Sequence, residues 1–132
     1  MIPKQRLGLE SVTDFVIRRL DSRYVLVEIE KPRDRIFTAA NDFTAQFSHA
    51  FGQVLDFQQW VDDHTQYARH LMPEISSPRG LLIIGRSADL TPSKKQKLER
   101  FNVNSAKVDA RTFDQVADEA RRLYENIHHR RA

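Results

Sequence analysis

The sequence contains no cysteine. This absence excludes disulfide bonds, metal sites built from thiolates and a cysteine nucleophile. No apolar run among the 132 residues is long enough to cross a bilayer, and the first residues lack the apolar stretch of a secretory signal. We therefore expect a cytoplasmic protein that has no contact with a membrane.

Several catalytic and nucleotide-binding motifs are also missing. The sequence has no GxxxxGK[ST] or GxGxxG phosphate loop, no GxSxG and no HExxH, and its five histidines do not form a metal signature. Hydrophobic residues make up 40% of the chain and charged residues 30%, which is typical of a folded domain. The length predicts one domain spanning residues 1–132.

The chain carries a modest excess of basic residues. Its formal net charge is +3 and its isoelectric point is about 9.4, which favours anionic partners without identifying one. Lysine and arginine concentrate in residues 94–97, 121–122 and 128–131. Such runs more often lie on solvated helix faces than at binding sites.

Alternating hydrophobicity predicts three strands in the first third of the chain. They cover residues 15–20 and 24–30, with a further short strand at 7–10 and a turn at 21–23. Pro32 is expected to end the third strand, because proline cannot donate to a β-ladder. We interpret the three strands as an antiparallel meander.

Helices and strands alternate in the remainder. The pattern predicts a long helix over residues 44–71, capped by Asn41 or Asp42, then a doubly buried strand at 81–85 and a helix at 92–101. A short strand at 106–108 and a final helix capped by Thr112 follow. The order β-β-β-α-β-α-β-α predicts an α/β fold with a mixed sheet, parallel in its second half and flanked by helices.

Three carboxylates are expected near one end of this sheet. Asp14 precedes one strand, and Glu28 and Glu30 share a face of the next strand, whereas Lys31 lies on the opposite face. Carboxylate oxygens suit Mg²⁺ or Mn²⁺, and like charges at close range need a cation or a proton. On spacing alone, such residues more often belong to an ordinary solvent-facing strand than to a metal site.

The long helix contains a glycine followed by a glutamine, Gly52 and Gln53. Glycine inside a helix costs roughly 1 kcal/mol relative to alanine. Tight packing on the sheet or a close approach of backbone or ligand would account for it. Gln53 either reaches the carboxylates or is satisfied by neighbouring backbone groups.

Four segments, residues 12–17, 24–32, 49–60 and 79–86, together resemble the core of the Shedu nuclease family. The blocks EIEKP and GQVLDFxxW, in this order and spacing, carry the resemblance. It extends from about Gly8 to the last helix. The resemblance implies a restriction-endonuclease-like fold of the PD-(D/E)xK superfamily, whose members cut DNA with Mg²⁺. The leading helix of the usual αβββαβ core is not found, as expected of a short family member or an excised domain.

The resemblance also implies the roles of individual residues. Asp14 and Glu28 match the metal-binding carboxylates, and Glu30 is expected as a third oxygen donor to Mg²⁺ or Mn²⁺. Gln53 matches a helix glutamine of related nucleases and would position water or phosphate. Lys31 would neutralise the transition state if it reaches the site.

One position departs from the motif. The family pattern has Glu-x-Lys, but residue 30 is glutamate and the lysine follows as Lys31. Three explanations remain open: Glu30 is a further metal ligand, a bulge turns Lys31 inward, or catalysis is impaired.

These implications lead to a metal-dependent DNA endonuclease as the first hypothesis. Arg86 and the basic residues at 94–97 would hold the DNA backbone, with little sequence preference. The alternative is a catalytically impaired nuclease-fold module that binds nucleic acid or a protein partner. The resemblance also implies a possible homo-oligomer, because nucleases of this superfamily often work as dimers or larger assemblies. The sequence itself has no coiled-coil heptads from which an oligomeric state would follow.

Overall fold

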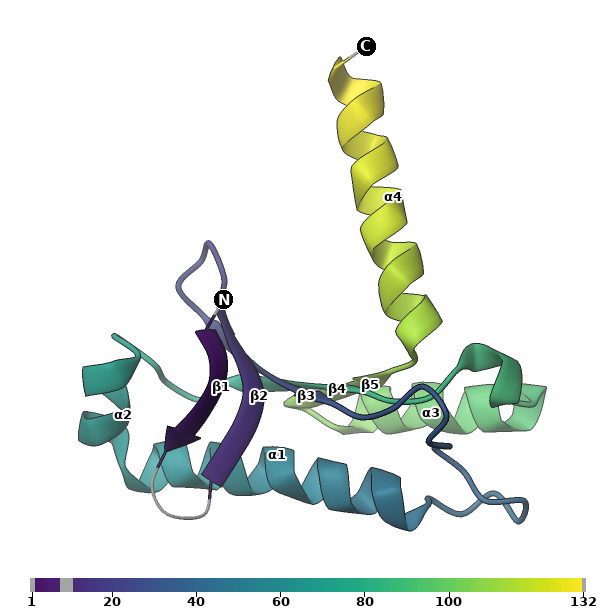
Figure 1. The fold of residues 1–132 in the computed structure, drawn as a ribbon, viewed down its shortest axis with the longest axis horizontal. Helices are drawn as coiled ribbons and strands as arrows, with labels where there is room; N and C mark the ends of the chain where they lie inside the picture. Colours follow the sequence, from purple (N-terminus) through teal and green to yellow (C-terminus); the bar gives the residue numbers. More distant parts are fainter. Residues whose placement is uncertain (1, 8–10, 132) are drawn as a thin grey trace.

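Five strands form a single mixed sheet in the computed structural model, with helices packed against one face (Figure 1). The structure describes residues 2–7 and 11–131, and the side chains of residues 15–127. The elements are β1 (Ile2–Leu7), β2 (Ser11–Arg18), β3 (Tyr24–Ile29), α1 (Ala45–Asp63), α2 (Thr65–Leu71), β4 (Arg79–Ile83), the 3₁₀ helix η1 (Ser87–Asp89), α3 (Pro92–Asn104), β5 (Val108–Arg111) and α4 (Phe113–Arg131).

The sheet has the spatial order β1-β2-β3-β4-β5. Strands β1, β2 and β3 pair antiparallel, and β3, β4 and β5 pair parallel. The predicted α/β class, the antiparallel meander and the parallel second half are therefore confirmed. Parallel neighbours need crossover connections, which α1 with α2 and then α3 supply.

The order of elements differs from the prediction in its helices. The single helix expected over residues 44–71 is two helices that meet at His64, whose φ of −126° and ψ of 44° are not helical. The Thr65 hydroxyl donates to the carbonyl oxygens of Val61 and Asp62. Hydrogen bonds of this kind compete with the helical ladder and favour a break.

The predicted caps of the long helix, Asn41 and Asp42, are wrong. Thr44 is the N-cap, and its hydroxyl oxygen accepts a hydrogen bond from the Phe47 N–H at 3.1 Å. Phe43 forms a β-bridge with Phe37, which holds the chain extended up to Thr44. This bridge depends on a contact that local sequence preferences do not encode.

Strand boundaries also shift. The first strand, β1, ends at Leu7, the first residue of the short strand expected at 7–10. Residues 8–10 of that expected strand lie outside the described residues. The third strand ends at Ile29, one residue before the predicted end at residue 30, and residues 31–34 form a turn in which the Asp34 N–H donates to the Lys31 carbonyl at 3.0 Å. Strands β4 and β5 begin at Arg79 and Val108 respectively.

The core lies between the sheet and α1. Tyr24 and Leu26 of β3 are buried in one cluster with Phe57 of α1. A second cluster joins Leu82 of β4 to Phe47 of α1. The two clusters follow one stripe of α1 at helical spacing, so burial of this stripe against the sheet fixes how the helix lies.

Gly80 allows α1 to approach the sheet closely. A Cβ at this position would stand 2.3 Å from Cγ1 of Val54, well inside van der Waals contact. Gly80 pairs with Leu26 on one side and with Val108 on the other. The smallest residue therefore occupies the centre of the parallel sheet where the helix crosses it.

Helix α4 projects away from the sheet (Figure 1). Leu123, Tyr124 and Ile127 on this helix are exposed. None of the helices in the described part of the chain combines the length and apolar content that crossing a bilayer requires.

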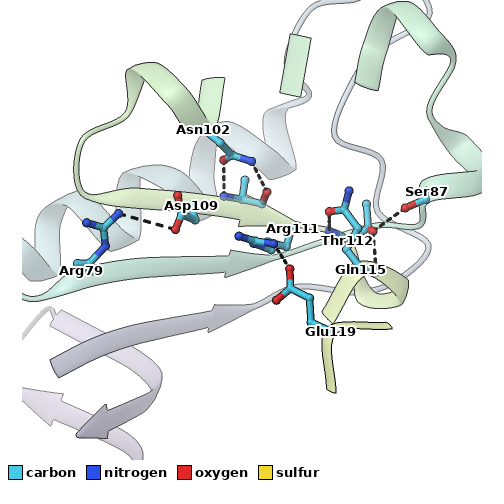
Figure 2. A network of polar contacts seen from close by, with 9 residues as sticks. Arg79, Ser87, Asn102, Asp109, Arg111, Thr112, Gln115 and Glu119 are labelled. Carbon is cyan, nitrogen blue, oxygen red and sulfur yellow. Dashed lines mark hydrogen bonds and ion pairs between the residues drawn. The ribbon is translucent and has the colours of Figure 1, made fainter. Parts of the chain in front are cut away.

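A polar network anchors the start of α4 (Figure 2). The Thr112 hydroxyl accepts from the Gln115 N–H, and the Gln115 side chain accepts from the Thr112 N–H at 3.0 Å. This reciprocal pair is a capping box and confirms Thr112 as the expected cap. Burial alone would raise the pKa of Asp114, but hydrogen bonds from the Ser87 backbone and side chain outweigh it and lower that pKa.

Candidate metal centre

Glu28 is a nearly buried carboxylate at the carboxyl end of β3. Its relative exposure is 9%, whereas most acidic side chains of the described chain lie in solvent. Strand alternation places it on the same face as Tyr24 and Leu26, which pack against α1. Buried carboxylates need a compensating partner such as a hydrogen-bond donor or a cation. The sequence alone did not distinguish this position from a solvent-facing one.

Gln53 lies on the same side of the sheet as Glu28. Leu82, the partner of Glu28 on β4, is buried in a cluster with Ala50 of α1. Gln53 follows Ala50 by one helical turn and precedes Phe57 by another, at the edge of the buried stripe and itself half-buried. The fold therefore places the glutamine and the carboxylate on the same face of the sheet.

Asp14 belongs to β2, next to β3. The register pairs Phe15 with Val27, so one further step along the antiparallel ladder brings position 14 opposite position 28. The side chain of Asp14 lies outside the described residues. Its expected place beside Glu28 is compatible with the backbone register, and its role as a ligand stays a prediction.

Glu30 and Lys31 lie beyond the end of β3. The Glu30 N–H donates to the Ile83 carbonyl at 2.8 Å, which extends the pairing with β4, and its side chain is half-buried. The Lys31 N–H donates to the Asp34 carboxylate at 3.3 Å, and its side chain is exposed. Because Lys31 lies in the turn after β3, strand alternation does not decide which face of the sheet its side chain occupies, and its predicted position opposite Glu28 stays a prediction.

Gly52 has no neighbour that explains it. A Cβ at this position would meet nothing within 4 Å. Tight packing on the sheet, one of the explanations offered for this glycine, is therefore excluded. The structure gives no reason for glycine here.

Glu28 and Glu30 supply the oxygen donors that a divalent cation prefers. Among the side chains that the structure describes, no three His, Cys, Asp or Glu residues gather closely enough to hold a metal ion. The third member of the expected set, Asp14, falls outside those side chains. The donor chemistry of the two glutamates fits Mg²⁺ or Mn²⁺, with Asp14 needed to complete the set.

The turn after β3 is fastened to the end of β4. Gly85 has a φ of 75°, and a Cβ there would approach the Asp34 carbonyl oxygen to 2.8 Å. Its N–H donates to the Lys31 carbonyl at 3.3 Å. The positive φ and the close approach of the Asp34 carbonyl both require glycine at position 85. The hydrogen bond to Lys31 places the turn after β3 and the end of β4 at one edge of the sheet.

Basic side chains gather at this same edge. Arg35 follows β3 and Arg86 follows β4, and their guanidinium groups lie 3.9 Å and 3.6 Å from the carboxylate of Asp89. Arg33 is exposed in the turn of residues 31–34. Sequence reasoning identified Arg86 but missed Arg33 and Arg35. The signal available was that carboxyl ends of parallel strands meet at one edge.

The basic run at residues 94–97 does not present all its charges to solvent. The Lys97 ammonium donates to the Asn41 carbonyl and lies 5.5 Å and 5.2 Å from the ring centroids of Phe37 and Phe43. Lys95 is exposed. The run therefore contributes both to packing and to the surface.

The family model for the C-terminal region of the Shedu protein SduA matches residues 1–117. The chain belongs to this family. No curated protein matches the sequence.

The Shedu match confirms the resemblance seen in the sequence. It covers all five strands and α1, and therefore every residue predicted for the site: Asp14, Glu28, Glu30, Lys31 and Gln53. It ends within α4, at Ala117. The roles predicted for those residues, the metal and the DNA partner all stay predictions, as does the homo-oligomer.

Proposed function

We propose that this Shedu family protein is a metal-dependent DNA endonuclease with a PD-(D/E)xK, restriction-endonuclease-like fold. Membership of the family suggests a role in antiphage defence. The single observation that carries the nuclease proposal is Glu28. A carboxylate that is 9% exposed at the carboxyl end of a central strand, on the sheet face that α1 covers, supports a role in binding a cation.

Glu28, Glu30 and Asp14 would hold Mg²⁺ or Mn²⁺ in this proposal. Oxygen-only donors suit both ions. The bound cation would polarise a phosphodiester oxygen and lower the pKa of a water molecule. Burial of Glu28 strengthens its attraction for a cation, because the local dielectric constant is lower than in water.

Other side chains would orient and neutralise the substrate. The Gln53 amide both donates and accepts hydrogen bonds and would position the attacking water or the phosphate. Arg33, Arg35 and Arg86 share the edge of the sheet at which Glu28 lies, and would hold the DNA backbone. Lys31, exposed in the same turn, is the cation nearest in sequence to the glutamates and would neutralise developing charge.

A second candidate is a module that binds nucleic acid or a protein partner without cutting DNA. The observation that favours it is Glu30, which stands where the motif has lysine, while Lys31 lies beyond the strand in a turn. Such a module would bind DNA to the same extent with and without Mg²⁺.

Cleavage of DNA by the purified chain separates the two candidates. Supercoiled and linear plasmid would be incubated with protein in Mg²⁺, Mn²⁺ or EDTA, and nicked and shortened products quantified on gels. We expect cutting with either metal and none in EDTA, since the reaction depends on the cation. DNA binding without cutting in any of the three conditions would support the binding module instead.

A further inference from the structure

A shallow pocket of about 390 Å³ lies between the segment that precedes α1 and the surface of α3. Its volume falls in the range of sites for small ligands, roughly 300–1,000 Å³. The residues that line it come from these two segments alone: Asn41, Phe43, Ser93, Gln96, Lys97, Arg100, Phe101 and Asn104. None of the proposed metal-site residues is among them.

One wall of the pocket is aromatic. Phe43 and Phe101, both half-buried, meet edge to face with 5.6 Å between ring centroids. Phe43 stacks on buried Phe47 at 4.6 Å, and Phe101 stands against the same ring at 5.4 Å. These contacts with the core fix the exposed edges of the two rings, so the wall is rigid. Aromatic edges fixed in this way offer edge-to-face contact to a planar base.

The other side of the pocket is cationic and polar. Lys97 is held in place by the Asn41 carbonyl and by two phenylalanine rings, and Arg100 is exposed. Among the described residues that line the pocket, none is acidic. The side-chain amides of Gln96 and Asn104 add donors and acceptors at the rim.

The pocket and the candidate metal centre lie on different sides of α1. Phe47 and Phe51 of this helix contact Phe101 of α3. Gln53 lies at the opposite edge of the buried stripe, beside Phe57, which packs with β2 and β3. A ligand in the pocket would therefore occupy a site separate from the carboxylates.

We propose that this pocket binds a nucleotide, with the base against Phe43 and Phe101 and the phosphate held by Arg100 and Lys97. An aromatic wall, two cations and rim amides, without a carboxylate, match a planar base attached to an anion. The nucleotide is either free or an unpaired residue of a DNA strand. Only the DNA source rests on the proposed nuclease function.

Nuclear magnetic resonance titration of the ¹⁵N-labelled 132-residue chain in EDTA tests the proposal. The probes are dAMP, deoxyadenosine, inorganic phosphate, a single-stranded decamer and its duplex. We expect dAMP to shift the amide signals of Asn41, Phe43, Arg100 and Asn104, and to bind at least about tenfold more tightly than phosphate or deoxyadenosine. Preference for the decamer over dAMP would indicate the DNA source, and preference for dAMP the free nucleotide.

Two matched variants locate the site. Arg100→Gln is expected to weaken dAMP binding about tenfold, because it removes a charge-assisted hydrogen bond. Arg122→Gln makes the same replacement at an exposed position of α4 that does not line the pocket, and its affinity is expected to stay within about twofold of the wild type.

Three results would overturn the nucleotide site. They are the absence of shifts at these residues with every probe at about 10 mM, equal affinity for phosphate and dAMP, and equal weakening by the two substitutions. Because the titration contains no metal, its failure leaves the cleavage assay unaffected. Equally, if the chain fails to cut DNA, the dAMP titration still tests whether the pocket binds a nucleotide.

Discussion

Glu28→Gln is expected to lower the rate of metal-dependent DNA cleavage by at least about 100-fold. The substitution keeps the size of the side chain and removes the charge that would hold the cation. It should leave the fold intact, since an amide replaces a carboxylate that is 9% exposed at the end of β3. Initial rates of plasmid nicking in Mg²⁺ provide the measurement, and circular dichroism confirms folding.

Glu125→Gln is the matched control. It removes the same charge from an exposed position of α4, the helix that projects away from the sheet in Figure 1. Its cleavage rate is expected to stay within about twofold of the wild type, as is usual for surface charges. If Glu28→Gln cleaved DNA as fast as this control, Glu28 would not be a metal ligand.

Phe47→Ala is expected to lower the free energy of unfolding by about 3–5 kcal/mol. Phe47 is 1% exposed and packs against Phe43 and Phe101. Truncation removes this packing and leaves a cavity between α1, α3 and the sheet. Urea denaturation followed by circular dichroism gives the difference in unfolding free energy between variant and wild type.

Leu20→Ala serves as the reference for this comparison. Leu20 is fully exposed in the turn after β2, so its truncation should change the free energy of unfolding by less than about 0.5 kcal/mol. A loss below about 1 kcal/mol for Phe47→Ala would mean that α1 does not pack against the sheet through this ring.

The sheet could be predicted from the sequence because its signals are local. Alternation in residues 15–30 and the apolar run at 81–85 are each visible within one short segment. The points at which elements end were harder to predict. The break at His64 follows from a hydroxyl at Thr65 that hydrogen-bonds backward, and the start of α1 depends on the bridge between Phe37 and Phe43. The hydrophobic periodicity of the sequence predicts neither of these contacts.

The candidate site was predictable only in part. Spacing alone left Glu28 indistinguishable from a surface glutamate, and the family resemblance supplied its role. The structure adds that the Glu28 side chain is nearly buried. Its strand partner is Leu82, 54 positions later in the chain, and a pairing over that distance is not visible in the local sequence. Arg35 was missed for the same reason, since its proximity to Arg86 depends on parallel pairing of β3 with β4.

The nucleotide pocket gave no signal in the sequence. Phe43 precedes α1 and Arg100 lies in α3, so α1, α2, β4 and η1 separate them along the chain, and the two residues line one pocket only in the folded protein. The basic run at 94–97 indicated a cationic helix face, but not that Lys97 would lie between two phenylalanine rings.

Binding of Mn²⁺ to the wild type and to Glu28→Gln tests the central claim most directly. Free Mn²⁺ gives an electron paramagnetic resonance signal that diminishes when the ion is bound, so titration reports affinity without DNA. We expect a site in the wild type that Glu28→Gln weakens at least about tenfold, whereas Glu125→Gln leaves it unchanged. Equal Mn²⁺ affinity in the wild type and Glu28→Gln would contradict a catalytic cation held at the end of β3.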